Sequence, residues 1–346
     1  MQRALANLVS QARSRQITFC AEQRQLSQRW LEPVLDELLT STRLARAAAD
    51  REFHALTAQT PVCEPASFGE ATPATYPIGF CQWICNAVWE RLSTDERVAR
   101  LRRRGLLWKK VFCIGEGCYF QNVIQVGDYL IDPAFDSLDG RAIPVVCTPL
   151  ATAPVENLDN WARYAAVARL YYHVEVYPNR YFPLLFPLVP FLAVRSSGRL
   201  ELLFHQQQLF LLDLSEEWRR IRDLTQTAEW QARTLPETCV QQLSRFCGDG
   251  SFEQFPCAFR PSDDRALLDA LQDWRQLRTL KPKALERTLL ALHQLTTRAA
   301  SRLRAANIMV PAAAGPDPTA GPGLSRTSTD GHGWHEGANL IQTIST

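Results

Sequence analysis

The chain has no long apolar run. Its most apolar segment, Phe182 to Val194, is interrupted by Pro183, Pro187 and Pro190, and it is shorter than the roughly 20 residues that a membrane-spanning helix needs. The first residues also lack the apolar stretch of a secretory signal peptide. We therefore expect no membrane span, and a protein that is cytoplasmic or exported without a cleaved signal peptide.

The sequence also lacks a strong bias of charge. It has 38 Lys and Arg residues against 36 Asp and Glu residues, so no large positive field attracts a polyanion and we expect no nucleic-acid partner. Four arginines cluster at Arg100 and 102–104, on a predicted helix that also carries Asp95 and Glu96. Such a run is typical of a solvated helix face.

No Gly-rich phosphate loop or dinucleotide fingerprint occurs in the sequence, so no nucleotide cofactor is predicted. The ten cysteines are irregularly spaced, and we expect them to be mostly reduced. Zinc is an alternative explanation for Cys81 with Cys85 and Cys113 with Cys118, but neither pair has the Cys-x2-Cys spacing of a zinc knuckle. We therefore predict no metal and no cofactor.

Hydrophobic periodicity and composition divide the chain into four predicted regions. They are an N-terminal helical region (1–60), an α+β core with a small meander (61–214), a C-terminal helical region (215–306) and a Pro-, Gly- and Ser-rich disordered tail (307–346). The meander is assigned to strands at 191–194, 200–204 and 209–214. Ser93-x-x-Glu96 is interpreted as a capping box that starts a helix.

Cys81 stands at a predicted helix start. It follows Gly79 and Phe80 and opens an apolar pattern at i, i+3, i+4 and i+7, which predicts an amphipathic helix. The partial positive charge and free N–H groups of a helix N-terminus stabilise a thiolate. Cys81 is therefore the candidate nucleophile, whereas Cys85, one turn further on, is predicted to pack in the core.

A Gly-Asp turn at 127–128 joins two strands of a predicted hairpin. The register set by this turn pairs Val126 with Tyr129 and puts Gln121 diagonally next to Asp132 on one face. We predict that the candidate helix packs against this hairpin, and that Gln121 and Asp132 face the candidate nucleophile.

Residues 76–147 resemble two related groups of thiol enzymes, the transglutaminase-like cysteine peptidases and the arylamine N-acetyltransferases. The resemblance rests on the Gly-Phe-Cys motif ending at Cys81 and on the Ile-Asp-Pro motif around Asp132. It implies a papain-like fold for the predicted core, with a cysteine, a histidine and an aspartate acting in that order. In those families the first strand of the hairpin supplies the histidine, where this sequence has Gln121 or Asn122. A glutamine hydrogen-bonds a thiol but does not accept its proton near neutral pH.

Another base would have to come from one of six histidines. His173 is the candidate, because it alone lies in a strand-like aromatic context. The alternative is a hydrogen-bonded structural residue.

We therefore predict an α+β fold with a papain-like core between helical regions, and the site residues Cys81, Gln121, Asp132 and His173. The predicted function is that of a degenerate or atypical thiol-enzyme fold, which acts through its cleft as a binding or regulatory module for a peptide or protein partner. The alternative is an active cysteine-dependent hydrolase or acyltransferase, in which Cys81 is the nucleophile and Asp132 orients the base.

Overall fold

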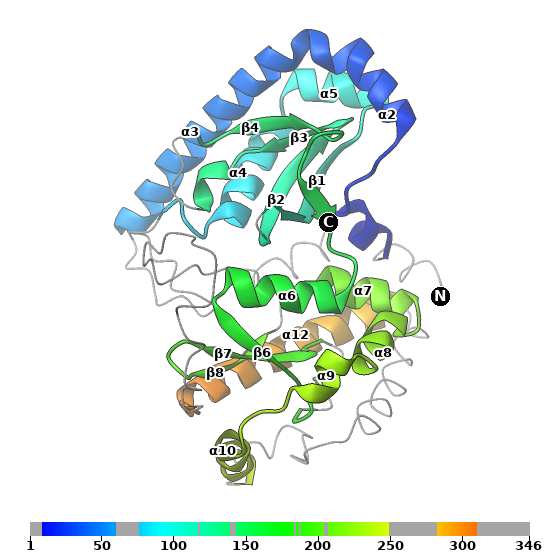
Figure 1. Ribbon diagram of the computed structural model, residues 1–346. Coiled ribbons are helices and arrows are strands. Elements are labelled where there is room, and N and C mark those ends of the chain that lie inside the picture. The colour runs from blue at the N-terminus through cyan, green and yellow to red at the C-terminus, as the bar shows by residue number, and fades with distance from the viewer. Residues whose placement is uncertain are drawn as a thin grey trace, which may run out of the picture. The chain divides into compact units, whose positions relative to one another are not determined.

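The computed structural model describes residues 9–59, 76–116, 118–138, 143–182, 185–186, 188–203, 207–248 and 282–309. The described residues divide into two compact units, which are the Cys81 unit (within 14–158) and the C-terminal unit (9–13 and the described residues from 159 to 309) (Figure 1). The division after Leu158 differs from the predicted boundaries at 60 and 214, because the helices before residue 60 pack onto the helix that carries Cys81. The predicted disordered tail (307–346) starts too early, because Ile308 is buried and its carbonyl accepts a hydrogen bond from the Leu200 N–H at 3.0 Å. From residue 310 onward the tail lies outside the described residues.

A five-stranded antiparallel sheet forms the centre of the Cys81 unit. Its strands are β1 (Trp108–Gly115), β2 (Tyr119–Val126), β3 (Tyr129–Asp132), β4 (Val146–Pro149) and β5 (Val155–Asn157), in the order β4-β3-β2-β1-β5. The predicted hairpin register is confirmed, since Val126 pairs with Tyr129. Gly127 has a φ of 56° in the turn, and a Cβ atom there would clash with the hydroxyl group of Ser27.

Helices make up the rest of this unit. They are α2 (Ala21–Leu26), the π-helix η1 (Ser27–Leu31), the 3-10 helices η2 (Glu32–Val34) and η4 (Phe135–Ser137), α3 (Leu35–Gln59), α4 (Cys81–Ser93) and α5 (Glu96–Arg103). The predicted capping box at Ser93 is wrong, because Ser93 is the last residue of α4. Asp95 caps α5 instead, and its carboxylate accepts a hydrogen bond from the Arg97 N–H at 2.8 Å.

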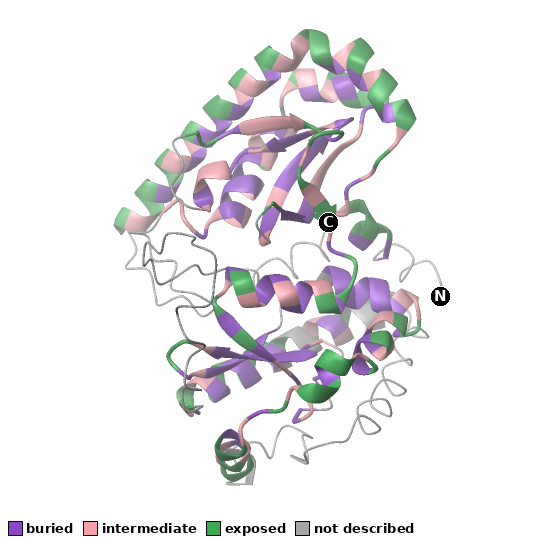
Figure 2. Ribbon diagram, viewed as in Figure 1, coloured by how far each residue is buried: buried purple, intermediate pink, exposed green. Residues whose placement is uncertain are grey.

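The two faces of the sheet have different packing partners. On one face Trp108 stacks on Trp89 of α4, with ring centroids 5.2 Å apart, and Lys110 Nζ donates to Asn86 Oδ1 of α4 at 2.8 Å. The other face contributes to a buried apolar cluster that comprises Ile17, Val111, Cys113, Val123, Leu130 and Leu150. Figure 2 shows that the central strands and much of α4 are buried.

Amide side chains hold the segment that covers the second face. The Ile17 N–H donates to Asn157 Oδ1 at 2.6 Å, and Asn157 Nδ2 donates to the Ile17 carbonyl at 3.2 Å. Gln125 makes the same pair of hydrogen bonds with Thr18. Its side-chain oxygen accepts from the Thr18 N–H at 3.0 Å, and its side-chain nitrogen donates to the Thr18 carbonyl at 2.7 Å. These side chains satisfy backbone groups that a further strand would otherwise pair.

Helix α3 packs along α4 through one face. The buried residues of this face recur every three or four positions, and they are Leu38, Thr42, Ala45, Arg46, Ala49 and Phe53. Arg46 is the charged member of the set. A buried arginine requires a partner, because desolvation of an unpaired charge is costly.

The C-terminal unit contains a three-stranded antiparallel sheet in the order β6-β7-β8. Its elements are α6 (Trp161–Tyr171), β6 (Val174–Pro178), β7 (Phe191–Arg195), β8 (Leu200–Leu203), α7 (Gln207–Ser215), α8 (Arg219–Thr225), α9 (Ala228–Ala232), α10 (Glu237–Gly248) and α12 (Pro282–Ala305). Leu192 and Leu202 of the sheet belong to one buried cluster with Leu243 of α10 and Leu303 of α12.

The predicted meander is correct in two strands, β7 and β8, and wrong in the third. Residues 209–214 belong to α7, and β6 supplies the third strand. The run at 209–214 is nearly all apolar and buried, and such a run has no period that separates a buried helix from a buried strand. The chain as a whole has an α+β fold. Within the described residues, none of the helices combines the length and apolar character that crossing a membrane requires.

Candidate functional site

Cys81 is the first residue of α4, as predicted. The turn at Tyr76–Gly79 precedes it, and Gly79 has a φ of 81°, a conformation that favours glycine. The Gly79 N–H donates to the Ser137 carbonyl at 3.0 Å, which joins this turn to η4. Phe80 has non-helical dihedral angles, and its carbonyl accepts the first helical hydrogen bond, from Ile84, at 2.9 Å.

The Cys81 thiol is buried and held by an amide. The residue is 1% exposed, and Asn122 Nδ2 of β2 lies 3.5 Å from the sulfur atom. Burial raises the pKa of the thiol well above its ordinary value, and the hydrogen bonds from Asn122 offset only part of this rise. The position at a helix start favours the thiolate, but desolvation is the larger effect. The thiol therefore stays protonated at neutral pH.

Asp132 and Gln121 form the second contact of the predicted site. Gln121 Nε2 donates to Asp132 Oδ2 at 2.6 Å, and the Ala134 N–H donates to Asp132 Oδ1 at 2.9 Å. Burial raises the pKa of Asp132 to about 7, and the nearby Asp136 adds to the rise; the hydrogen bonds from Ala134 and Gln121 oppose it. Gln121 Oε1 is buried with no hydrogen-bond partner among the described residues.

Gln121 and Asn122 point to opposite faces of the sheet because they are neighbours on one strand. Gln121 pairs with Cys113, which belongs to the buried apolar cluster that contains Ile17. Asn122 pairs with Phe112, on the face of the sheet that α4 covers. The prediction that Gln121 and Asp132 face Cys81 therefore needs correction: the side chain of Gln121 donates to Asp132, and it is Asn122 that reaches the thiol. Asp132 acts on Cys81 through its negative charge, which further raises the pKa of the thiol.

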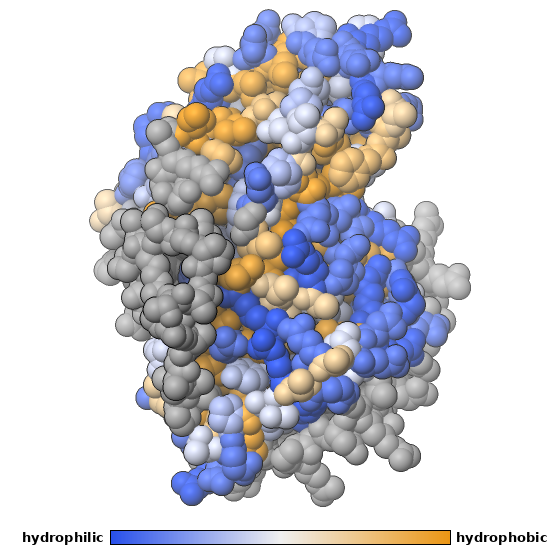
Figure 3. All heavy atoms as spheres, in the orientation of Figure 1, coloured by the Kyte–Doolittle hydropathy of each residue, from blue (hydrophilic) through white to orange (hydrophobic). Residues whose placement is uncertain are grey.

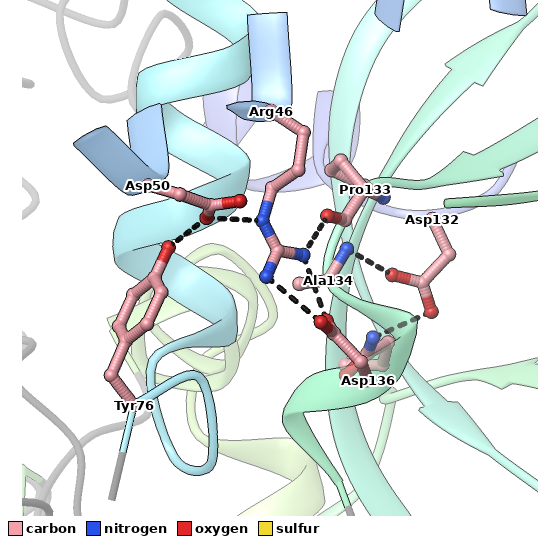
Figure 4. Close-up of polar contacts among 8 residues, drawn as sticks. Arg46, Asp50, Tyr76, Asp132, Pro133, Ala134 and Asp136 are labelled. Carbon is pink, nitrogen blue, oxygen red and sulfur yellow. Dashed lines mark hydrogen bonds and ion pairs between the residues drawn. The ribbon is translucent and has the colours of Figure 1, made fainter. Parts of the chain in front are cut away.

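A buried arginine fixes the loop that follows Asp132 (Figure 4). Arg46 Nη1 donates to the Pro133 carbonyl at 2.7 Å, and the guanidinium group binds Asp136 through both carboxylate oxygens at 2.7 and 2.9 Å. Arg46 Nε also donates to Asp50 at 2.6 Å, and the Tyr76 hydroxyl donates to the same Asp50 oxygen. We call Arg46, Asp50, Tyr76 and Asp136 the Arg46 cluster.

The sequence interpretation missed this cluster and the role of Asn122. One signal was present for Arg46: it falls on the apolar face of α3, at the i+4 position from Thr42 and the i+8 position from Leu38. A charged residue in such a stripe indicates a buried ion pair. Its partner, Asp136, could not be identified in the same way, because it lies in a short helix after the sheet strand.

Aromatic rings surround the start of α4. The Phe53 ring is stacked on that of Tyr76 at 4.1 Å and makes edge contacts with Phe80 at 4.8 Å and Trp83 at 5.2 Å. Phe53 comes from α3, whereas Phe80 and Trp83 flank the nucleophile candidate in sequence. These rings contribute apolar surroundings of the kind that raise the pKa of a thiol.

His173 belongs to the C-terminal unit, in the turn between α6 and β6. Its φ is 50°, and its side chain is exposed. His54 is the one histidine among the described residues of the Cys81 unit, and it is exposed near the end of α3. His205, His332 and His335 lie outside the described residues, as does the side chain of His293.

Cys85 and Cys113 are free buried thiols. Burial raises the pKa of Cys85 to about 12 and that of Cys113 further. In the described part of the chain, no group of three or more His, Cys, Asp or Glu residues is arranged to hold a metal ion.

Comparison with known proteins does not place the chain in a family. No protein-family model matches it, and no significant match was found among curated proteins or solved structures.

Proposed function

We propose that the Cys81 unit is a papain-like fold whose nucleophile position has become structural, and that the protein acts as a binding or regulatory module for a peptide or protein partner. The observation that carries this proposal is the contact between Cys81 and Asn122. An amide nitrogen donates to sulfur but has no lone pair that accepts the thiol proton. The contact therefore holds the thiol without activating it.

Burial supports the same conclusion. A nucleophile must reach a substrate carbon, and the enclosed Cys81 has no exposed surface of consequence. Its raised pKa also keeps the thiolate population small at neutral pH, and the thiolate is the reactive form. Both effects act against attack on an acyl group.

The alternative is an active cysteine-dependent hydrolase or acyltransferase. Two features favour it: Cys81 opens a helix, and the partly buried Asp132 follows on the neighbouring hairpin in the order that the thiol enzymes use. That function requires an opening at Cys81 and a base, for which His173 is the candidate. Asp132 would then orient the base.

Alkylation distinguishes the two functions. The native protein is treated with iodoacetamide between pH 6 and 9, and the labelled peptides are quantified by mass spectrometry. We expect partly exposed Cys118 to react, and Cys81 to react only after unfolding. Labelling of Cys81 ahead of Cys118 below the ordinary cysteine pKa of about 8.5 would support the enzyme.

Turnover provides the second test. Hydrolysis of p-nitrophenyl acetate should be the same in the wild type, Cys81→Ala and the control Cys118→Ala. Peptides selected by the wild type from a displayed random library should also bind Cys81→Ala with unchanged affinity. Turnover that disappears in Cys81→Ala but persists in Cys118→Ala would overturn the proposal.

A further inference from the structure

Helix α5 carries arginines on two opposite sides. Arg97, Arg100 and Arg104, the last of them the C-cap residue, are spaced i, i+3 and i+7 and share one side. Arg102 lies about 200° around the helix axis from Arg100, because each residue advances by about 100°. Arg100, Arg102 and Arg104 are all exposed.

The side with Arg100 and Arg104 is built around Trp30. The guanidinium carbon of Arg104 lies 3.8 Å from the centre of the Trp30 ring, and that of Arg29 lies 4.6 Å from it. Gln23 of α2 fixes the chain just after α5, since its side chain donates to the Gly105 carbonyl at 3.1 Å and accepts from the Leu107 N–H at 2.8 Å. The end of α5 is therefore held against α2 by Gln23 and against η1 by Trp30.

Acidic side chains offset the positive charge on this side only in part: Glu96 interacts electrostatically with Arg100, but its ion pair is with Arg103, at 2.5 Å. Arg97 has ion pairs with Asp95 at 3.3 Å and Glu37 at 3.5 Å. Among the described residues, no carboxylate lies within ion-pair distance of Arg29, Arg100 or Arg104. We call the set Arg29, Trp30, Arg100 and Arg104 the arginine face. Figure 3 shows hydrophilic side chains at the upper right of the view, with apolar ones among them.

We propose that the arginine face binds an acidic, extended segment of a protein partner. The positions Arg100 and Arg104 are separated by about 6 Å along the helix axis. Alternate residues of an extended peptide lie on one side and repeat at about 6.6 Å, so carboxylates two residues apart match the two guanidinium groups. Arginine binds a carboxylate through two parallel hydrogen bonds. This surface is independent of the site at Cys81.

Other anionic partners fit less well. A nucleic acid bound without sequence preference needs a groove that follows many phosphates and free aromatic faces for its bases. Here three arginines gather at one helix end, and two of them already lie over the Trp30 ring. The chain's formal net charge of +2 also provides little long-range attraction for a polyanion.

The test is the affinity of the full chain for a fluorescein-labelled (Glu-Gly)6 peptide, measured by anisotropy at about 25 mM and 200 mM salt. The peptide should bind the wild type at low salt and more weakly at high salt, and a (Gln-Gly)6 peptide should not bind. Arg100→Ala should weaken binding about two- to fivefold, as expected for one exposed charge pair.

Arg102→Ala is the matched control, because it removes the same charge from the opposite side of the same helix; its affinity should equal that of the wild type. Arg100 has no contact with Trp30 among those described, so its replacement tests binding without disturbing the ring, and thermal unfolding of each variant checks the fold. The proposal is overturned if the peptide fails to bind, or if both variants weaken binding equally. It is also overturned if dT12 or phosphatidylserine vesicles bind the arginine face more tightly than the peptide does.

Discussion

Replacement of Arg46 by methionine should destabilise the Cys81 unit more than any loss of a surface ion pair. Methionine keeps much of the side-chain volume but removes the charge and five N–H donors. Asp136 would lose both of its hydrogen bonds from Arg46, and the Pro133 carbonyl would lose one. The loop that holds the Asp132 carboxylate would then lose its attachment to α3.

The size of the effect follows from burial. The side chain of Arg46 is 4% exposed and that of Asp136 is 13% exposed, so water replaces little of the lost interaction. Removing one partner of a buried ion pair costs about 3–5 kcal/mol, because the other charge remains buried. We expect about 3 kcal/mol here, since the residual exposure of Asp136 gives it some hydration. Arg46→Met combined with Asp136→Asn should recover part of this loss.

Amide hydrogen exchange of the most protected peptides in α4 and β2 measures the free energy of opening for this unit separately from the other. Arg91→Met is the control, because Arg91 forms an ion pair with Glu52 while both side chains are substantially exposed (32% and 48%). The control should cost no more than about 1 kcal/mol. The reasoning fails if Arg46→Met costs no more than Arg91→Met, or if the double variant is less stable than Arg46→Met alone.

Three further predictions concern the hairpin and its neighbours. The pKa of Asp132 is raised to about 7, so the folded state binds the proton of this carboxyl group more tightly than the unfolded state does. Protonation of Asp132 therefore stabilises the folded state. This stabilisation is complete below about pH 4 and is lost as the pH rises to about 7. Urea unfolding of wild type against Asp132→Asn should show this slope, and a difference independent of pH would contradict it. Asn122→His should increase alkylation of Cys81 relative to Asn122→Ala, because imidazole can accept the thiol proton; equal rates in the two variants would argue against that. Gly127→Ala should lower the free energy of unfolding by about 1–3 kcal/mol, and the loss should be smaller when Ser27 is also replaced by alanine. An unchanged midpoint of urea unfolding in Gly127→Ala would refute the clash with Ser27.

The features predictable from the sequence were those fixed by local chemistry. The Gly-Asp turn set the pairing of Val126 with Tyr129, and the apolar spacing after Cys81 located the start of α4. The diagonal relation of Gln121 to Asp132 followed from that register and corresponds to their hydrogen bond.

Features decided by distant contacts could not be predicted in this way. The alternation of side chains along a strand puts Gln121 and Asn122 on opposite faces of the sheet, but it does not say which face α4 covers. The covered face decides which of the two amides contacts Cys81. The apolar run at 209–214 carried no period, so its helix depends on burial from all sides. The partner of Arg46 lies 90 residues away in sequence.

The hydrogen bonds between Ile17 and Asn157 join residues 140 positions apart. During synthesis the hairpin of β2 and β3 can form as soon as it emerges, since its contacts are local. The Ile17 segment must wait for another 25 residues after Asp132 before its Asn157 partner exists. A nascent chain halted at Pro149 therefore carries a sheet without β5, with the Ile17 backbone still lacking these amide partners. Completion of this unit is tied to the arrival of its final strand.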